Sequence, residues 1–311
     1  MPIRLIAIDL DGTLLNSTAH VSERNLAALH AAEARGIEIA IATGRRHCYA
    51  MRVLRSLVRP AHSALISSNG TVIRTLDSTL LHRAHMPLAI ARWLCAHVRD
   101  FRNTLVLTFD KVRPDGEDDR GALVCEHLDD LHTSIGRWME INSPYIAPIS
   151  PIEDALTTRA PIQMMLCGSL DRMRAAEVHL LTDPRVSNVE SADTPGIEVA
   201  LHRTEYAERD LCILDILPAG CSKGSALLEL ARTRNIAPTD ILAIGDNWND
   251  VPMFRVAGRS ALMTNAPADL KILASEQRWQ LVPSNNNDGV AVAIETALAD
   301  NAPPLETTTK C

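Results

Sequence analysis

The chain has 311 residues, of which 46% are hydrophobic, and this length predicts about two domains with sizeable buried cores. A formal net charge of −7 and an aromatic content of 3% argue against nucleic acid or an anionic membrane as the main partner. No apolar run approaches the ~20 residues that span a bilayer, and Asp9 and Asp11 interrupt the early apolar stretch, unlike a secretory signal. Seven scattered cysteines without a Cys-x-x-Cys pair predict reduced thiols. We therefore expect a cytoplasmic protein, and its oligomeric state stays open.

The first apolar run ends in two carboxylates, Asp9 and Asp11, and a glycine follows at once. Residues i and i+2 of an extended strand project to the same face, so both carboxylates converge on one small volume. Their repulsion is about 4 kcal/mol at roughly 4 Å and an effective dielectric near 20, which calls for a cation or a shared proton. A solvated Asp-x-Asp-Gly turn explains the same residues. This motif alone therefore leaves both interpretations open.

The next segments alternate between helix and strand patterns. Ser22 is expected to cap a helix that ends at Gly36. A strand over 37–42 follows, then a helix over about 45–58 and a strand over 64–66. Short strands alternating with helices predict an α/β fold with a Rossmann-like, doubly wound parallel sheet. The turn signals after the third strand predict a hairpin that leaves this sheet.

The pattern changes near residue 86 and returns near Pro218. We predict a helix over 86–98, a strand over 104–109, a strand over 162–166, a helix over 170–181 and further strands up to residue 216. The predicted division is a core domain over 1–85 and 216–300, an inserted α/β cap domain over 86–215 and a polar tail over 301–311. The insertion is either a lid or a passively tethered domain. Linkers close to the expected crevice favour a lid.

Three later segments repeat the layout of an apolar strand, a break and a helix start. They end in Thr43-Gly44-Arg45, in Lys223-Gly224 at a helix start, and in Asp246-Asn247-Trp248-Asn249-Asp250. Ligands of doubly wound sheets bind outside the carboxyl ends of the strands. We therefore expect one crevice to receive Asp9, Asp11, Thr43, Asp246 and Asp250.

On these residues the chain resembles the Cof-type phosphatases of the haloacid dehalogenase (HAD) superfamily, which are mostly magnesium-dependent phosphohydrolases. The four signatures stand in the family's order as Asp9-Leu10-Asp11-Gly12-Thr13, Thr43-Gly44-Arg45, Lys223-Gly224 and Gly245-Asp246-Asn247-Trp248-Asn249-Asp250. Also similar to that subfamily are Ser67-Ser68-Asn69-Gly70, Met263-Thr264-Asn265-Ala266 and Asn287-Asp288-Gly289-Val290. The ordered set makes a chance match improbable.

The resemblance implies a role for each catalytic carboxylate. Asp9 would be the nucleophile that forms an aspartyl phosphate, and Asp11 the general acid and base. Mg²⁺ would be held by Asp9, the backbone carbonyl of Asp11 and Asp246, with Asp250 supporting that set. A second acid at position 11 is absent from metal-independent dehalogenases, so hydrolysis or phosphoryl transfer is favoured.

The same resemblance implies the phosphate contacts. Thr43, Gly44 and Lys223 would hold the phosphoryl group, and Asn249 would hydrogen-bond near the nucleophile. Arg45 and Asn69 would meet substrate at the rim, although a helix-start arginine and a turn-forming asparagine explain these two residues equally well. Trp248 departs from the family, where smaller or acidic residues are common, and this puts substrate choice in doubt.

The expected function is Mg²⁺-dependent hydrolysis of small phosphomonoesters, such as sugar phosphates or similar metabolites. A phosphomutase and a catalytically silent phosphate-binding regulatory protein are the alternatives.

Overall fold

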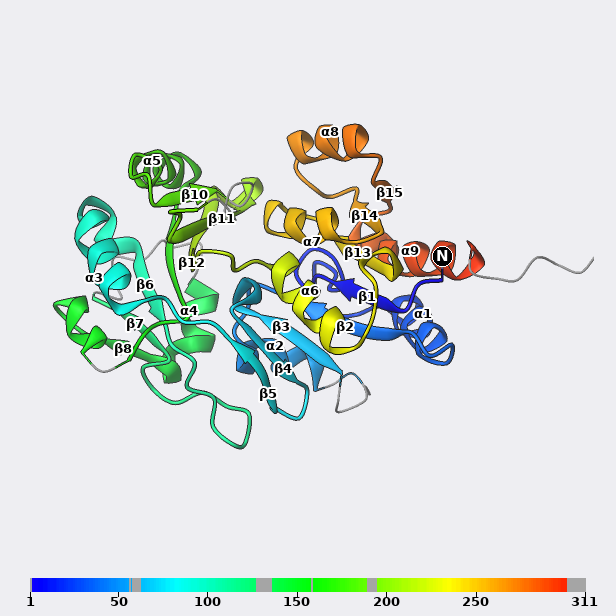
Figure 1. Ribbon diagram of the computed structural model, residues 1–311, viewed down its shortest axis with the longest axis horizontal. Coiled ribbons are helices and arrows are strands. Elements are labelled where there is room, and N and C mark those ends of the chain that lie inside the picture. The colour runs from blue at the N-terminus through cyan, green and yellow to red at the C-terminus, as the bar shows by residue number, and fades with distance from the viewer. Residues whose placement is uncertain are drawn as a thin grey trace, which may run out of the picture.

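The computed structural model describes residues 2–55, 57, 63–126, 136–157, 159–188 and 195–300, so the predicted polar tail over 301–311 lies outside the described residues. This part of the chain forms two sheets that lie side by side, each packed against helices (Figure 1). None of the helices in the described ranges has the length and apolarity needed to cross a membrane.

The first sheet has eight strands in the order β15-β14-β13-β1-β2-β3-β4-β5. The strands from β15 to β3 run parallel, which confirms the predicted doubly wound sheet. Their bounds are Gln280–Val282, Arg259–Met263, Ile241–Gly245, Leu5–Ile8, Glu38–Ala42 and Ala64–Ser67, and β4 and β5 are Val72–Thr75 and Leu80–Arg83.

The prediction that the hairpin leaves this sheet is wrong, because β4 and β5 extend its edge in antiparallel pairing. The reason lies in the turn Ser68–Gly70, where Asn69 has φ 52° and Gly70 has φ 99°. Ser68, at φ 48°, is left-handed as well. These three residues reverse the chain tightly enough for β4 to fold back along β3.

Two groups of helices cover the two faces of the first sheet. One face packs against α1 (Glu23–Glu33), α2 (His47–Leu54) and α9 (Gly289–Asp300). The other packs against α6 (Lys223–Thr233), α7 (Val251–Val256) and α8 (Ala268–Gln277). The predicted cap of α1 is confirmed, since the Ser22 hydroxyl accepts a hydrogen bond from the Asn25 backbone N–H at 3.1 Å. Helix α2 is shorter than predicted.

The second sheet has seven strands in the order β10-β11-β12-β9-β6-β7-β8. Their bounds are Val186–Asn188, Val199–Tyr206, Leu211–Pro218, Gln163–Gly168, Leu105–Thr108, Leu123–Cys125 and Ile146–Pro148. Helices α3 (Leu88–His97) and α5 (Leu170–Leu180) cover one face. Met139, from α4 (Gly136–Asn142), packs against the other.

Short 3-10 helices connect many of these elements. Those with described side chains are Ser68–Gly70, Arg99–Thr104, Ser143–Tyr145, Ile152–Leu156, Ala207–Arg209, Pro238–Asp240, Trp248–Asp250 and Asn285–Asn287.

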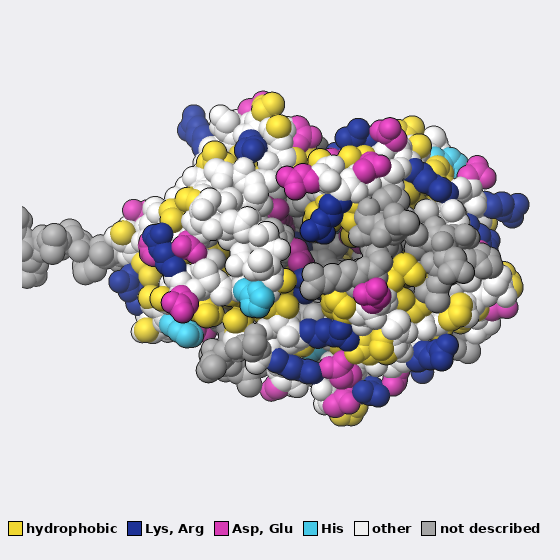
Figure 2. Space-filling model, turned by 180° about the vertical axis from the view of Figure 1, so that it is seen from behind, with side chains coloured by type: hydrophobic (Ala, Val, Ile, Leu, Met, Phe, Trp, Pro, Cys, Tyr) yellow, Lys and Arg dark blue, Asp and Glu magenta, His cyan; other side chains and the backbone are white. Residues whose placement is uncertain are grey.

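We call the first sheet with its helices the first part of the molecule, and the second sheet with its helices the second part. The two parts touch at several polar contacts. Arg74 and Arg83 of the first sheet both donate to Asp110 of the second part, at 2.7 and 2.8 Å. Near the linker, the His202 ring nitrogen Nε2 lies 3.1 Å from the Cys221 carbonyl. Figure 2 shows the molecule hollowed between the two parts, with acidic side chains visible in the hollow.

Gly70 provides a test of how tightly the β3–β4 turn packs. A Cβ at this position would lie 2.0 Å from the Ser222 carbonyl oxygen at the start of α6, whereas Gly36, at φ 76°, has open space around it. Gly36→Ala should cost about 1–2 kcal/mol of unfolding free energy from its left-handed backbone alone. Gly70→Ala should cost clearly more, measured by urea unfolding. Equal losses for the two variants would contradict the close packing.

Candidate active site

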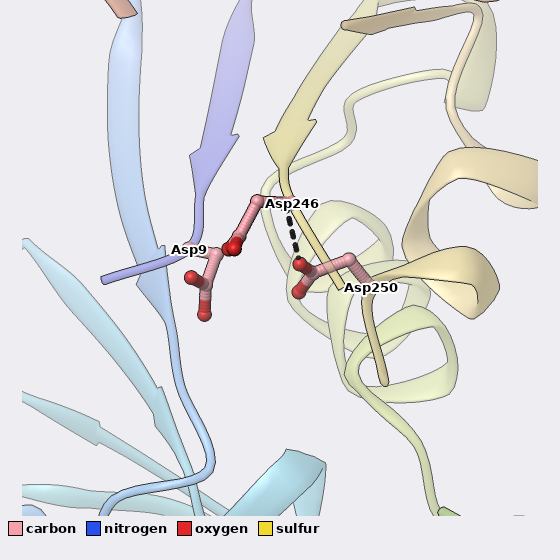
Figure 3. A group of neighbouring side chains, drawn as sticks. All are labelled: Asp9, Asp246 and Asp250. Atoms are coloured by element: carbon pink, nitrogen blue, oxygen red, sulfur yellow. Dashed lines mark hydrogen bonds between the residues drawn. The ribbon is translucent and has the colours of Figure 1, made fainter. Parts of the chain in front are cut away.

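Three carboxylates meet where two neighbouring parallel strands end. Asp9 directly follows β1 and Asp246 directly follows β13, and the register of these strands pairs Ile8 with Ile244. Asp9, Asp246 and Asp250 each offer an oxygen within 4.8 Å of the others, and all three are buried. Figure 3 shows the Asp246 side chain pointing toward Asp9, with Asp250 coming from the segment that follows. We call these three residues the acid cluster.

Lys223 supplies the positive charge of this region. Its ammonium donates to Asp9 Oδ1 and to Asp250 Oδ1, both at 2.6 Å, and its side chain is 0% exposed. The capping box of Ser222 and Ser225 fixes the start of α6 and therefore the position from which Lys223 projects. A fully buried lysine is rare without such partners, so the two carboxylates and the ammonium hold one another in place.

Asp250 shapes the loop that carries Asp246. Its Oδ2 accepts hydrogen bonds from the backbone N–H groups of Asp246 and Asn247, at 2.9 and 3.0 Å. Asp246 is itself held by the Thr13 hydroxyl at 2.9 Å and by the Asn265 amide at 3.2 Å. Both oxygens of Asp250 are therefore engaged by the protein, whereas Asp9 Oδ2 has no hydrogen bond within the described ranges.

The electrostatics of the acid cluster favour a bound cation. Burial, followed by the nearby charge of Asp250, raises the pKa of Asp9 to about 7 even though Lys223 opposes the shift. Burial and the charges of Asp9 and Asp250 raise the pKa of Asp246 well above its ordinary value. Burial alone would lower the pKa of Lys223, but the charges of Asp250 and Asp9 outweigh it and raise that pKa. One ammonium does not balance three buried carboxylates, and hard oxygen ligands suit Mg²⁺.

Asp11 lies outside the acid cluster. Its carboxylate accepts a two-point ion pair from Arg45, with Nε at 2.7 Å from Oδ2 and Nη2 at 2.5 Å from Oδ1. The Arg45 guanidinium also lies 4.5 Å from the ring centre of Tyr49. The Asp11 side chain is 38% exposed. The metal contact predicted for Asp11 uses its backbone carbonyl and stays a prediction.

Thr43-Gly44-Arg45, which we call the phosphate loop after its predicted role, is built around Thr43. The Thr43 hydroxyl accepts from the Arg45 backbone N–H at 3.1 Å, and its carbonyl accepts from the Asn69 backbone N–H at 3.1 Å. A Cβ on Gly44 would lie 3.3 Å from the Asn69 side-chain amide, so the two segments are in close contact. Thr43 is buried.

Asn69 is fully buried instead of lying at an exposed rim. Its amide nitrogen donates to Asp215 Oδ2 at 2.7 Å, and its amide oxygen accepts from Asn249 Nδ2 at 3.1 Å. Asn249 is therefore joined to the phosphate loop through Asn69. A role for either residue in substrate binding remains a prediction.

Two residues of β11, Tyr206 and Arg203, lie near this region from the second part of the molecule. Tyr206 lies at the end of β11. Its pKa is raised well above 10, first by burial and then by the negative charges of Asp11, Asp246 and Asp9. Trp248 is partly buried against the core between the first sheet and α6, α7 and α8. The Arg203 guanidinium of β11 lies 5.9 Å from its ring centre. Trp248 therefore packs at the contact between the two parts.

The structure adds residues to which the sequence assigned no role. Thr13 and Asn265 stand inside quoted motifs, so their position beside Asp246 could have been inferred from strand order. Tyr206 and Asp215 lie in no motif, and no sequence signal marks them. These two residues are far from the site in the sequence, and only the packing of the second sheet against the first brings them close to it.

Replacing Lys223 tests the balance of charge at the site. Lys223→Met leaves Asp9 and Asp250 facing each other without the ammonium that both accept from. Removing one partner of a buried ion pair typically costs about 3–5 kcal/mol, and we expect a loss of that size in denaturant unfolding at pH 8. A loss no larger than that of the control Lys271→Met, whose half-buried ammonium donates only to the Thr264 carbonyl, would contradict the bridging role.

Replacing Asp246 tests the raised pKa. In EDTA, wild-type stability should fall as pH rises above the unfolded carboxyl value of 3.8, because the unfolded chain then releases a proton that the folded state still holds. Asp246→Asn removes this penalty, so at pH 8 it should unfold at a higher temperature than wild-type protein, with the gap narrowing toward pH 5. Scanning calorimetry measures this, with exposed Asp269→Asn as control. A variant less stable at every pH would contradict the inference.

The sequence is similar over most of its length to a known protein family and to known phosphatases. A family model described as haloacid dehalogenase-like hydrolase matches residues 6–294. The chain is 31% identical over 310 residues to 5-amino-6-(5-phospho-D-ribitylamino)uracil phosphatase YwtE of Bacillus subtilis (strain 168), covering 96% of this chain and 99% of that protein. It is 26% identical over 273 residues to the HMP-PP phosphatase of Escherichia coli O157:H7, covering 86% of each chain.

Solved structures give the same picture of the fold. The structure of a haloacid dehalogenase-like hydrolase from B. subtilis matches with a TM-score of 0.70 and 23% identity, over 94% of this chain and 99% of that one. The family match over nearly the whole chain and the full-length relative establish that this protein belongs to the haloacid dehalogenase-like hydrolases, as its ordered motifs predicted.

Proposed function

We propose that this protein is a Mg²⁺-dependent phosphatase that hydrolyses small phosphomonoesters through an aspartyl phosphate on Asp9. The observation that carries the proposal is the state of Asp9: one oxygen is fixed by Lys223, and the other takes no hydrogen bond among the described residues. A carboxylate held in this way is oriented for attack while its repulsion from a phosphate dianion is offset by the ammonium.

The residues at the site fit a magnesium ion. Asp9, Asp246 and the backbone carbonyl of Asp11 would hold it, and Asp250 would support the set by fixing the Asp246 backbone. When bound, the ion would neutralise charge on the phosphoryl oxygens. The burial that raises the pKa values of Asp9 and Asp246 favours a cation over two unpaired carboxylates.

The reaction would proceed in two displacements. Asp9 Oδ2 attacks phosphorus, the bond to the ester oxygen breaks, and Asp11 gives that oxygen a proton. Water then attacks phosphorus and gives a proton to Asp11, the bond from phosphorus to Asp9 breaks, and inorganic phosphate leaves. Thr43, Gly44 and Lys223 would hold the phosphoryl oxygens during both steps. Arg45 would have to release Asp11 for it to exchange protons.

The substrate is proposed to be a small phosphorylated metabolite, such as a sugar phosphate or a related compound. Two relatives carry names of phosphatases that act on small phosphorylated molecules. The residues 86–215 are proposed to be a cap that closes over the site, because Tyr206 of that segment lies close enough for the charges of Asp246 and Asp9 to shift its pKa. The proposed substrate contacts are Arg45, Asn69 and Asn249. A cytoplasmic location of the protein remains a prediction.

Two alternatives follow from the same fold. A phosphomutase would return the phosphoryl group from Asp9 to the product before water attacks, so an isomer would accumulate in place of inorganic phosphate. A silent phosphate-binding protein would show no turnover. The intact set of Asp9, Asp11, Lys223 and Asp246 argues against the silent alternative.

Asp9→Asn is the direct test of the proposed function. Wild-type protein with Mg²⁺ should release inorganic phosphate from an aryl phosphate and, at higher kcat/KM, from at least one member of a metabolite panel. EDTA or Asp9→Asn should lower kcat by at least about 1,000-fold, because the nucleophile or its neutralising charge is lost. A malachite-green assay measures this, with Asp269→Asn as the control variant. Turnover that survives both changes would sink the mechanism.

A further inference from the structure

Asp215 is a buried carboxylate that the reaction described above does not use. It lies in β12, the last strand of the second sheet, shortly before the chain returns to α6. Its neighbours Leu214 and Ile216 pack in the apolar layer beneath α3 and α5, so Asp215 points to the opposite face of the sheet, toward the first part. It is 5% exposed, and burial raises its pKa to about 7 against the lowering effect of its hydrogen bonds.

Asp215 accepts two hydrogen bonds from side-chain amides. Oδ2 accepts from Asn69 Nδ2 at 2.7 Å, and Oδ1 accepts from Gln163 Nε2 of β9. The Asn69 oxygen in turn accepts from Asn249 Nδ2. Gln163, Asp215, Asn69 and Asn249 thus form a continuous buried polar chain from the second sheet to the residue beside Asp250.

The direction of each hydrogen bond in this polar chain is set by Asp215. A carboxylate has acceptors only, so the Asn69 amide must turn its nitrogen toward Asp215 and its oxygen toward Asn249. Asn69 also has the left-handed φ of 52°, and its amide lies against Gly44. A turned Asn69 amide would present a donor to the Asn249 donor and disturb both the phosphate loop and the Asp246–Asp250 segment.

We propose that Asp215 is a positioning residue that orients the Asn69 side chain. Through Asn69, the position of the second sheet is coupled to the phosphate loop and the acid cluster. The proposal rests on the proposed function for its kinetic readout. Its structural content is independent of that function, because it concerns the order of the turn at Asn69. Asp215 reaches the site through Asn69 and touches none of the reacting groups.

Asp110 offers a matched control. It is also a buried carboxylate at the contact between the two parts, and it accepts from Arg74 and Arg83. It has no hydrogen bond to the polar chain in the described ranges. Asp110→Asn therefore reports the general effect of weakening a buried contact between the two parts.

The kinetic test compares Asp215→Asn with Asp110→Asn at pH 8 and saturating Mg²⁺. An amide at position 215 has one acceptor for two donors, so the Asn69 amide loses its fixed direction. We expect kcat to fall by about 10- to 100-fold, the usual effect of losing an outer-shell partner, with KM changed less than about threefold. Asp110→Asn should keep kcat within about threefold of wild-type protein. Equal effects of the two variants on kcat would overturn the proposal.

The exchange variant, which combines Asn69→Asp with Asp215→Asn, tests whether the order of these hydrogen bonds holds the turn at Asn69 in place. In it the amide nitrogen placed at position 215 would donate to the carboxylate placed at position 69. That carboxylate would still accept from Asn249, and the amide oxygen at position 215 would still accept from Gln163. All three hydrogen bonds are therefore restored, and only the one between positions 69 and 215 is reversed in direction. Because Asn69 is itself a proposed substrate contact, the readout for the exchange variant is its stability. Its urea unfolding midpoint should lie above that of Asp215→Asn, a coupling expected of residues in one network. An exchange variant no more stable than Asp215→Asn would overturn the proposal.

Hydrogen–deuterium exchange of metal-free protein gives a readout that needs no activity. The backbone amides of 68–71 should exchange faster in Asp215→Asn than in wild-type protein and should recover in the exchange variant. Asp110→Asn should leave them unchanged. If wild-type protein has no phosphatase activity, the proposed function fails while this measurement still decides the role of Asp215. Unchanged exchange at 68–71 in Asp215→Asn would overturn it.

Discussion

The ammonium of Lys223, held between Asp9 and Asp250, is the interaction on which the rest of the site depends. It lies with no solvent contact at 2.6 Å from both carboxylates. Each of the three ionised groups would be strongly disfavoured in this position without the others. Their mutual contact therefore requires that β1, α6 and the segment after β13 meet at one point, although these elements are far apart in the chain.

Close backbone packing makes this meeting possible. Gly70 lets the β3–β4 turn approach the Ser222 carbonyl, and Ser222 caps the helix that presents Lys223. Gly44 lets the phosphate loop lie against Asn69. The same turn thus contacts the lysine helix, the phosphate loop and, through Asp215, the second sheet. Chemistry and domain contact are served by one small region of the first sheet.

Much of the fold was predictable because local patterns specified it. Ser22 before an amphipathic segment fixed the start of α1, and apolar runs followed by polar breaks located the parallel strands. The hairpin was predicted wrongly because turn residues indicate that the chain reverses, but not which neighbour the returning strand joins. Helix α2 was predicted too long at both ends, since it begins at His47 and ends at Leu54. At its start, Arg45 and Arg46 still belong to the turn after Thr43.

Sequence alone determined the chemical content of the site: the residues after β1, β2 and β13 and at the start of α6, because parallel strands bring their carboxyl ends to one edge. Only the tertiary structure decided how these groups are paired. It turned Asp11 toward Arg45 and away from the acid cluster, buried Asn69 between Asp215 and Asn249, and brought Tyr206 to the site. The physical reason is that such pairings depend on side-chain direction and on how two sheets pack, and neither property is encoded in a local stretch of residues.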